Sequence, residues 1–183
     1  MLIGTNEIAK TALLNIIAGK IEPTSGTIKY GSTVKLSYFE KNHDKYFDKN
    51  IDMIDWLRQY TESTDDTFIR GFLGRMLFSG EEVFKNVGVL SGGEKVRLMF
   101  SKVMLNQGNV LLMDEPTNHL DIESITALND GLERFKSSLI ISTFDEEIIN
   151  TACNRLVEIK KDGTIRDKSI SYEEYVEKFG IEN

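Results

Sequence analysis

The chain has 183 residues, of which 40% are hydrophobic and 28% charged, and a formal net charge of −7 at pH 7. This length suits one domain, or a core with a small inserted lobe, and the negative charge argues against a domain that coats nucleic acid by charge alone. A single cysteine, Cys153, excludes a disulfide framework and a cysteine-based metal site. No apolar run reaches the roughly 18–20 residues of a membrane span, and the single cysteine makes the cytoplasm the expected location.

The first elements along the chain are a short strand, a loop and a helix. Residues 1–3 are apolar and predict the end of a strand, residues 4–10 predict a loop, and residues 10–19 carry helical apolar spacing that Gly19 ends. After a turn at residues 23–26, the alternation over residues 27–31 and 33–39 predicts two short strands.

From Asp44 the pattern becomes helical. Apolar residues recur with helical spacing over residues 50–60, 65–77 and 93–105, and Asp65 and Asp66 are placed as a cap and a first-turn acid. We therefore expect residues 44–107 to form a helical lobe.

Buried strands return after this lobe. Residues 109–115 and 137–143 are apolar runs suited to a sheet that is covered on both faces. Residues 121–135 predict a helix capped by Asp121, residues 155–167 a hairpin around Asp162 and Gly163, and residues 171–179 a terminal helix. The order predicts a single α/β domain over residues 1–183, with a parallel-sheet core from residues 1–43 and 108–183 and the helical lobe of residues 44–107 inserted.

The loop after the first strand partly matches a phosphate-binding loop, which reads G-x-x-x-x-G-K-[ST]. Gly4 opens the frame and Lys10 and Thr11 close it, but Ala9 stands in place of the second glycine, and Glu7 puts a carboxylate where a phosphate would lie. Parallel α/β cores bind ligands at the carboxyl ends of their strands, and this loop follows such an end. The loop alone does not establish a nucleotide site.

A second candidate feature is the pair Asp114 and Glu115, which follows the apolar run "VLLM". A carboxylate at the end of a buried strand can hold Mg²⁺, and its neighbour can orient or deprotonate a water that attacks a phosphate. Solvated acids at the end of an ordinary strand are the alternative for the pair alone. The lysine loop upstream and "PTNHLD" downstream favour the nucleotide site.

A third candidate feature is "LSGGEKVRLMF", in which Ser91, Gly92 and Gly93 stand at the predicted start of a helix. Exposed N–H groups and the positive end of the helix dipole would face an approaching phosphate there. An ordinary serine cap is the alternative, and the order and spacing relative to "MDEPTNHLD" argue against it.

Together, "LSGGEK" and "NVLLMDEPTNHLD" resemble the signature motif and the Walker B and D-loop segment of ATP-binding cassette (ABC) domains. The letters "NHLD", "FLGRMLF" and "YEEYVEKF" resemble the ABC-F group, and most of all its second cassette. ABC-F proteins are soluble, carry two cassettes in one polypeptide, and in many cases act on the ribosome. The resemblance implies a P-loop NTPase (RecA-like) fold, from which the antiparallel strands that precede the Walker A loop of a cassette are missing.

The resemblance also implies the roles of residues. Lys10 would bridge the β- and γ-phosphates of ATP, Thr11 and Asp114 would hold Mg²⁺, and Glu115 would act on the attacking water. The loop would bind ATP, largely through backbone N–H groups, with Gly4, Asn6, Glu7, Ala9, Lys10, Thr11 and Ala12. The signature and D-loop would complete the nucleotide site of a second cassette with Ser91, Gly92, Gly93 and Asp121, and His119 would lie near the dimer seam or on the surface.

Several positions depart from the family pattern. Phe144 stands in place of the switch-loop histidine that contacts the γ-phosphate, and Lys41 stands in place of the Q-loop glutamine. Losing one preorganised contact of this kind costs about 10²–10³ in rate. If Glu7 and Ala9 must take positive φ, each costs roughly 1–2 kcal/mol. We therefore expect a working but weakened loop and slow hydrolysis.

The expected function is that of an ABC-F-type ATPase, in which ATP closes two cassettes, from one polypeptide or from two copies, for a task in translation on the ribosome. Three alternatives remain: a degenerate cassette that binds ATP without hydrolysis, the nucleotide-binding domain of a membrane transporter, and an inactive fragment. Arginines on the lobe are candidates for RNA contact, although a solvated helix face is favoured: Arg58, Arg70, Arg75 and Arg97.

Overall fold

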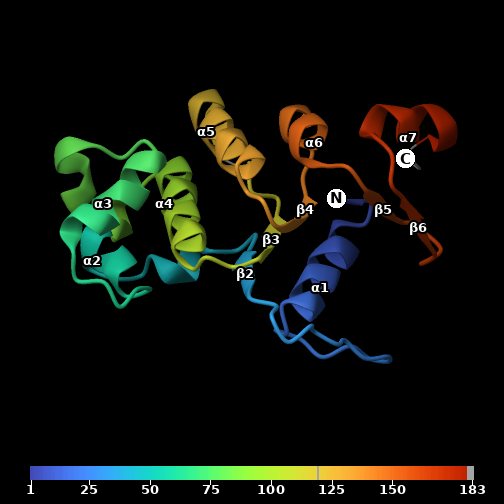
Figure 1. Ribbon diagram of the computed structural model, residues 1–183, viewed down its shortest axis with the longest axis horizontal. Coiled ribbons are helices and arrows are strands. Elements are labelled where there is room, and N and C mark those ends of the chain that lie inside the picture. Colours follow the sequence, from blue (N-terminus) through green and yellow to red (C-terminus); the bar gives the residue numbers. More distant parts are fainter. Residues whose placement is uncertain (119, 181–183) are drawn as a thin grey trace. The chain divides into compact units, whose positions relative to one another are not determined.

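A computed structural model describes residues 1–118 and 120–180 of the chain (Figure 1). His119, expected near a dimer seam, lies outside the described residues. The chain divides into two compact units. The first unit contains residues 1–41, 109–116 and the residues from 135 on, and the second contains residues 42–108 and 117–134.

The first unit is built on a six-stranded sheet in the order β2-β3-β4-β1-β5-β6. All neighbouring strands run parallel except β5 and β6, which form an antiparallel pair. This arrangement confirms the predicted α/β class with a largely parallel sheet. The strands are β1 (Leu2–Ile3), β2 (Leu36–Phe39), β3 (Val110–Asp114), β4 (Ser138–Ser142), β5 (Leu156–Ile159) and β6 (Ile165–Lys168).

Helix α1 (Glu7–Ile17) lies on one face of this sheet, and α6 (Glu146–Ala152) and α7 (Tyr172–Phe179) lie on the other (Figure 1). On the α1 face, Leu14 packs with Leu2 and Leu112 in a cluster that solvent barely reaches. Because side chains alternate along a strand, the next residue of β3 that points to this face is Asp114. The packing of α1 thus brings the end of β3 and the start of the helix to one place.

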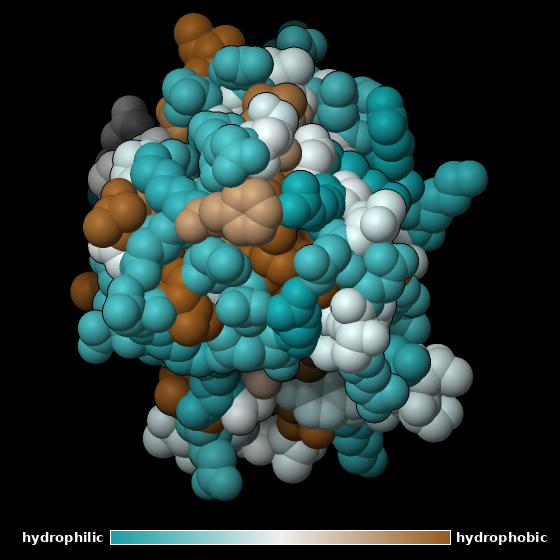
Figure 2. Space-filling model, turned by 90° about the vertical axis from the view of Figure 1, so that its left-hand side faces the viewer, coloured by the Kyte–Doolittle hydropathy of each residue, from teal (hydrophilic) through white to brown (hydrophobic). Residues whose placement is uncertain are grey.

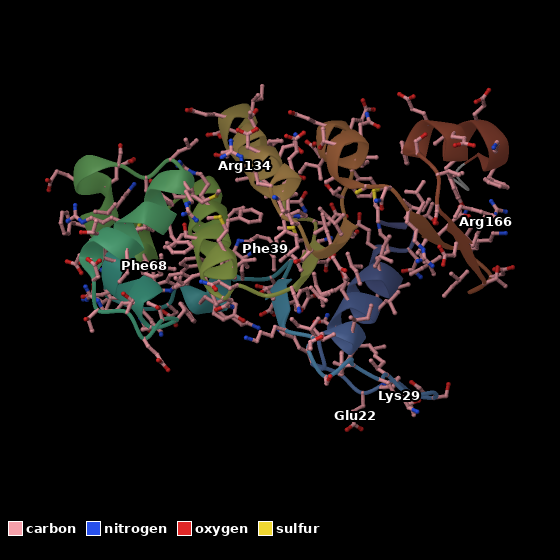
Figure 3. All side chains as sticks on the ribbon, in the orientation of Figure 1. Glu22, Lys29, Phe39, Phe68, Arg134 and Arg166 are labelled. Carbon is pink, nitrogen blue, oxygen red and sulfur yellow. The ribbon has the colours of Figure 1, made fainter. Side chains whose placement is uncertain are left out.

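The segment between α1 and β2 does not form the strand predicted over residues 27–31. A segment becomes a strand only when a neighbouring strand pairs with its backbone groups. In the structure, residues 27–31 pair with no strand. Glu22 and Lys29 lie on this exposed excursion, whereas Phe39 at the end of β2 is buried (Figure 3). The predicted strand over residues 33–39 is confirmed in its second half, as β2.

The second unit is helical, with its core around Trp56, whose ring stacks on Phe47 at 5.2 Å between centroids. Its helices are α2 (Met53–Arg58), α3 (Asp66–Arg75), α4 (Gly92–Leu105) and α5 (Ile122–Glu133), with 3₁₀ helices η1 (Asp44–Tyr46), η2 (Gly80–Phe84) and η3 (Val87–Val89). Asp52, Asp65 and Asp121 cap α2, α3 and α5 through their side chains, as acidic caps do. The space-filling view shows a mainly hydrophilic face with scattered hydrophobic side chains (Figure 2).

Across residues 1–118 and 120–180, every helix is too short or too polar to cross a membrane.

Candidate functional site

Strand β3 delivers Asp114 to the start of α1. The carboxylate is 1% exposed, and Thr11 donates a hydrogen bond from Oγ1 to Asp114 Oδ2 at 2.7 Å. Burial raises the pKa of Asp114 above its ordinary value, and the Thr11 hydrogen bond, Lys41 and Lys10 oppose this shift. A hydroxyl and a carboxylate in contact are two hard oxygen donors, which is the ligand type that Mg²⁺ takes. Thr11 and Asp114 therefore fit a magnesium ion.

Glu115, the next residue, has a left-handed backbone with a φ of 49°, which is uncommon for a residue with a side chain. The structure holds this conformation in two ways, since Glu115 N donates to Ser142 O at 2.9 Å and Ser142 Oγ donates to Glu115 Oε1 at 3.1 Å. Strained backbone of this kind concentrates at functional sites. Burial raises the pKa of Glu115, while the hydrogen bond from Ser142 and the charge of Lys10 lower it. Burial has the larger effect, so the carboxylate is more basic than a free glutamate.

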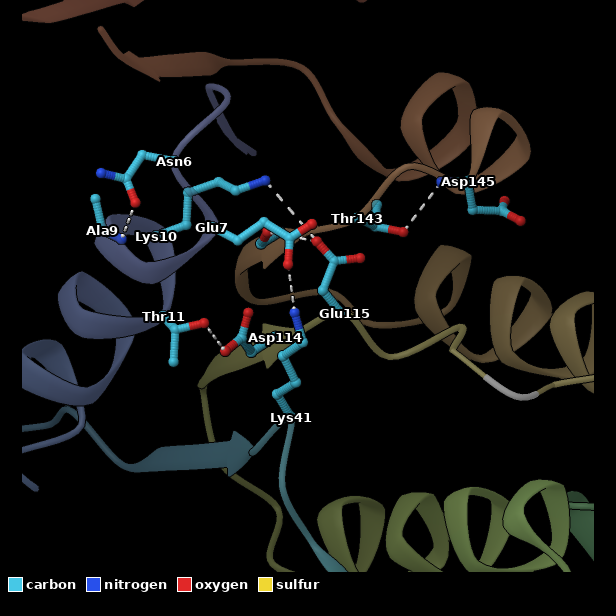
Figure 4. Close-up of polar contacts among 11 residues, drawn as sticks. Asn6, Glu7, Ala9, Lys10, Thr11, Lys41, Asp114, Glu115, Thr143 and Asp145 are labelled. Atoms are coloured by element: carbon cyan, nitrogen blue, oxygen red, sulfur yellow. Dashed lines mark hydrogen bonds and ion pairs between the residues drawn. The ribbon is translucent and has the colours of Figure 1, made fainter. Parts of the chain in front are cut away.

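Lys10 extends from α1 toward Glu115 and is 2% exposed. Its Nζ lies 3.9 Å from Glu115 Oε1 (Figure 4). The same Nζ lies 4.5 Å from the centroid of the Phe144 ring, and Phe144 is 66% exposed. An ammonium over an aromatic face is an attractive contact. Phe144 thus touches the lysine of the loop and offers it no hydrogen bond.

The loop differs from its sequence-based description in where the helix begins. Helix α1 starts at Glu7, and Asn6 caps it, because Asn6 Oδ1 accepts from Ala9 N at 3.0 Å and Asn6 O from Lys10 N at 3.2 Å. Glu7 and Ala9 are therefore helical and do not carry positive φ, so the expected strain of roughly 1–2 kcal/mol for each is wrong. Gly4 alone in the loop has positive φ, at 134°. The N–H groups of Glu7 and Ile8 stand in the open first turn of the helix.

The side chain of Glu7 points away from α1 and meets Lys41, just beyond the end of β2. Lys41 Nζ lies 2.7 Å from Glu7 Oε2. This hydrogen bond is the main cause that lowers the pKa of Glu7 and raises the pKa of Lys41. Two departures from the family pattern are therefore partners of each other.

The remaining predicted site residues lie in the second unit. Ser91 caps α4 in a capping box with Glu94, so Gly92 and Gly93 form the first turn of a helix of 14 residues. Asp121 caps α5 by accepting from Ser124 N at 2.8 Å. The sequence prediction of both helix starts is confirmed, and their nucleotide role stays a prediction.

The lobe arginines are engaged with their neighbours in the second unit. Arg58 pairs with Asp55 and Asp66. The guanidinium groups of the other three lie over aromatic rings at 4.7–4.9 Å: Arg70 over Phe84, Arg75 over Phe72, and Arg97 over Phe78. These contacts favour structural roles over RNA contact.

Sequence reasoning missed Ser142 and the Glu7–Lys41 pair. Both depend on which strands are neighbours in the sheet, since Ser142 ends β4 beside β3 and Lys41 follows β2 on the other side. The polar residue at the end of "LIIS" was a signal for Ser142, but only in a known strand order.

A family model described as "ABC transporter" matches residues 1–118. The ABC transporter ATP-binding protein YkpA of Bacillus subtilis (strain 168) is 50% identical over 181 residues, which are 98% of this chain and 33% of YkpA. YbiT of Escherichia coli O157:H7 is 40% identical over 98% of this chain and 34% of its own length, and ABC transporter F family member 5 of Arabidopsis thaliana is 34% identical over 97% and 26%. The chain thus spans about a third of the length of YkpA and YbiT.

Solved structures share the fold. A bacterial ABC transporter cassette solved as a dimer matches with a TM-score of 0.73 at 17% identity, over 92% of this chain and 84% of its own. An RNase-L inhibitor matches with a TM-score of 0.76 at 22% identity, over 97% and 35%. These likenesses confirm the predicted cassette fold.

Proposed function

Because the chain belongs to the ABC transporter family of ATP-binding cassettes, with ABC-F members among its relatives, we propose that it binds Mg·ATP and hydrolyses it slowly. One observation carries this proposal: the buried residues Lys10, Asp114 and Glu115 converge with the partly buried Thr11 where α1 begins and β3 ends. A buried lysine, a hydroxyl and two carboxylates have little structural reason to meet there, because each costs desolvation.

Binding follows from the loop and the strand end. Lys10 supplies a desolvated positive charge to the phosphates, and the open N–H groups at the start of α1 supply donors along the helix dipole. Thr11 and Asp114 would hold Mg²⁺, which when bound neutralises phosphate charge.

Hydrolysis rests on Glu115. Its raised pKa makes it a stronger base, and Ser142 fixes one carboxylate oxygen, so the other is free to orient a water and accept its proton. We propose that turnover is slow because Phe144 covers Lys10 without donating to the γ-phosphate.

We propose that a second cassette completes the site by contributing the start of its α4 helix, with Ser91, Gly92 and Gly93, and its D-loop with Asp121. A related fold has been solved as a dimer. The partner would be another part of a longer polypeptide or a second copy. Work in the cytoplasm, in translation on the ribosome, is the function we propose for the whole protein from its ABC-F relatives.

A second candidate is a cassette that binds ATP without hydrolysing it. Phe144 on Lys10 favours this candidate, because it leaves the terminal phosphate without a switch-loop donor.

The test is titration calorimetry of this chain with Mg·ATP beside Lys10→Ala, followed by steady-state phosphate release beside Glu115→Gln. Micromolar binding that is lost in Lys10→Ala supports the binding site. Turnover that is lost in Glu115→Gln supports the ATPase, and binding without turnover supports the second candidate. No binding at millimolar ATP contradicts the proposal for this chain.

A further inference from the structure

The Glu7–Lys41 ion pair stands at the mouth of the proposed phosphate site. Glu7 comes from the first turn of α1 and Lys41 from the residues after β2, and their side chains are 52% and 37% exposed. Figure 4 shows both side chains pointing toward the space that Lys10, Thr11, Asp114 and Glu115 also face. A phosphate that approaches the start of α1 therefore meets this pair.

Lys41 also faces the acids of the strand end. Its charge lowers the pKa of both Asp114 and Glu115, whereas the charge of Glu7 raises both. The two side chains thus act on the same two carboxylates with opposite signs. Asp114 is proposed to hold the metal ion, and Glu115 to act on the attacking water. Both therefore lie at the end of the site that a terminal phosphate would occupy.

The charged groups that meet at the site leave one negative charge in excess. Three carboxylates (Glu7, Asp114 and Glu115) and two ammonium groups (Lys10 and Lys41) converge there. Glu7 repels an arriving polyphosphate and at the same time occupies the cation that would attract it. A lysine ammonium is a point charge on a flexible stem, so it can leave one anion for another without moving the backbone.

We propose that Lys41 is a second phosphate-binding cation, that Glu7 holds it while no nucleotide is bound, and that its transfer to the terminal phosphate makes the site favour ATP over ADP. The inference rests on the proposed ATP binding. A solvent-exposed ion pair is weak, so a terminal phosphate can displace Glu7 from Lys41. ADP lacks that phosphate and leaves the pair intact, which makes Lys41 a specificity-determining residue.

Titration calorimetry with Mg·ATP and Mg·ADP tests this transfer on four proteins: the wild-type chain, Glu7→Gln, Lys41→Gln and the double variant. Glu7→Gln removes the competing anion, so the preference for ATP over ADP should rise about tenfold. Lys41→Gln should lower this preference by about tenfold, because Glu7 remains and its cation is gone. In the double variant the preference should stay below the wild-type value, because Lys41 is gone, and should exceed that of Lys41→Gln only by the direct repulsion that Glu7 exerts.

The matched control is Lys178→Gln, which breaks the exposed Lys178–Glu174 pair on α7 and should leave both affinities unchanged. If the wild-type chain binds ATP in a Lys10-dependent way but Glu7→Gln does not raise the preference, this inference is wrong and the proposed function stands. If the wild-type chain binds no nucleotide, the proposed function fails for it, and Glu7→Gln must then bring ATP binding into the measurable range. A Glu7→Gln chain that also fails to bind overturns the inference too.

Discussion

Gly4 follows β1 and opens the loop that leads into α1. No other residue type fits at this position. A Cβ at Gly4 would lie 2.3 Å from the carbonyl oxygen of Ile159, and φ is +134°. We expect Gly4→Ala to lower the free energy of unfolding by about 3 kcal/mol or more, because backbone on both sides must shift. Urea denaturation followed by circular dichroism measures this loss.

Gly163 in the β5–β6 turn is the control for this prediction. Its φ is also positive, at +82°, but open space surrounds the position of a Cβ. Gly163→Ala should therefore lose only about 1–2 kcal/mol, the backbone cost alone. Equal losses in the two variants would contradict the steric argument at Gly4.

Phe144 is the second residue for which the structure makes a specific prediction. Its ring covers the Lys10 ammonium at 4.5 Å and is largely exposed, so a smaller side chain fits in its place. We expect Phe144→His to raise steady-state phosphate release by about tenfold or more, because an imidazole donates a hydrogen bond to a terminal phosphate.

Phe144→Leu keeps an apolar side chain without an aromatic face or a donor, and it should not gain turnover. If Phe144→Leu gains as much as Phe144→His, release of Lys10 from the ring explains the effect, and a missing donor does not. If neither variant gains, Phe144 does not limit turnover.

At the scale of elements, the start of α4 depends on Glu94. Glu94 accepts from Ser91 N at 2.7 Å and pairs with Lys85 at 2.7 Å. Burial raises the pKa of Glu94, but the hydrogen bonds from Lys85 and Ser91 outweigh burial, so the pKa lies below the ordinary value of 4.5. A lowered pKa in the folded chain means stability that is present above pH 4.5 and is lost as the pH falls through the folded-state pKa.

Glu94→Gln keeps the capping box and removes the charge. At pH 7 we expect it to cost about 1 kcal/mol or less, and this cost should shrink as the pH falls through the lowered folded-state pKa of Glu94. Urea midpoints of both proteins at pH 7, 5 and 3 measure the difference. A constant difference across this range would show that the charge of Glu94 contributes nothing.

Most elements could be predicted because their apolar spacing and caps are local. The short helix α6 was not predicted, since in seven residues Ile148 and Ile149 set no clear period. Residues 27–31 alternate like a strand, but a strand needs a partner, and pairing is not a local property. The end of β3 and the loop lysine could be recognised because their motifs keep a fixed spacing over many residues. The seven residues of α6 are too few for such a pattern.

At the scale of the whole molecule, the proposed nucleotide contacts divide between the two units. The loop, Asp114 and Glu115 belong to the first unit, and Ser91–Gly93 belong to the second. We expect Mg·ATP to slow amide hydrogen exchange at the start of α1 and the end of β3 at every protein concentration, because these contacts need one chain only.

Protection at the start of α4 should instead require a second cassette. If the partner is another copy, protection there should grow with protein concentration, as mass action demands. Lys10→Ala should abolish both effects. Protection at α4 that is independent of concentration would contradict a composite site made by two copies.

The strand order sets when the site can form during synthesis. Strand β1, which leads into the loop, pairs with β4 and β5 and has no earlier neighbour in the sheet. When a nascent chain has emerged as far as Glu115, it therefore carries Lys10, Thr11, Asp114 and Glu115, while both strands that flank β1 are still to come. Contacts of such long range form late, so translation must pass residue 159 before an emerging chain can hold a nucleotide as the finished one does.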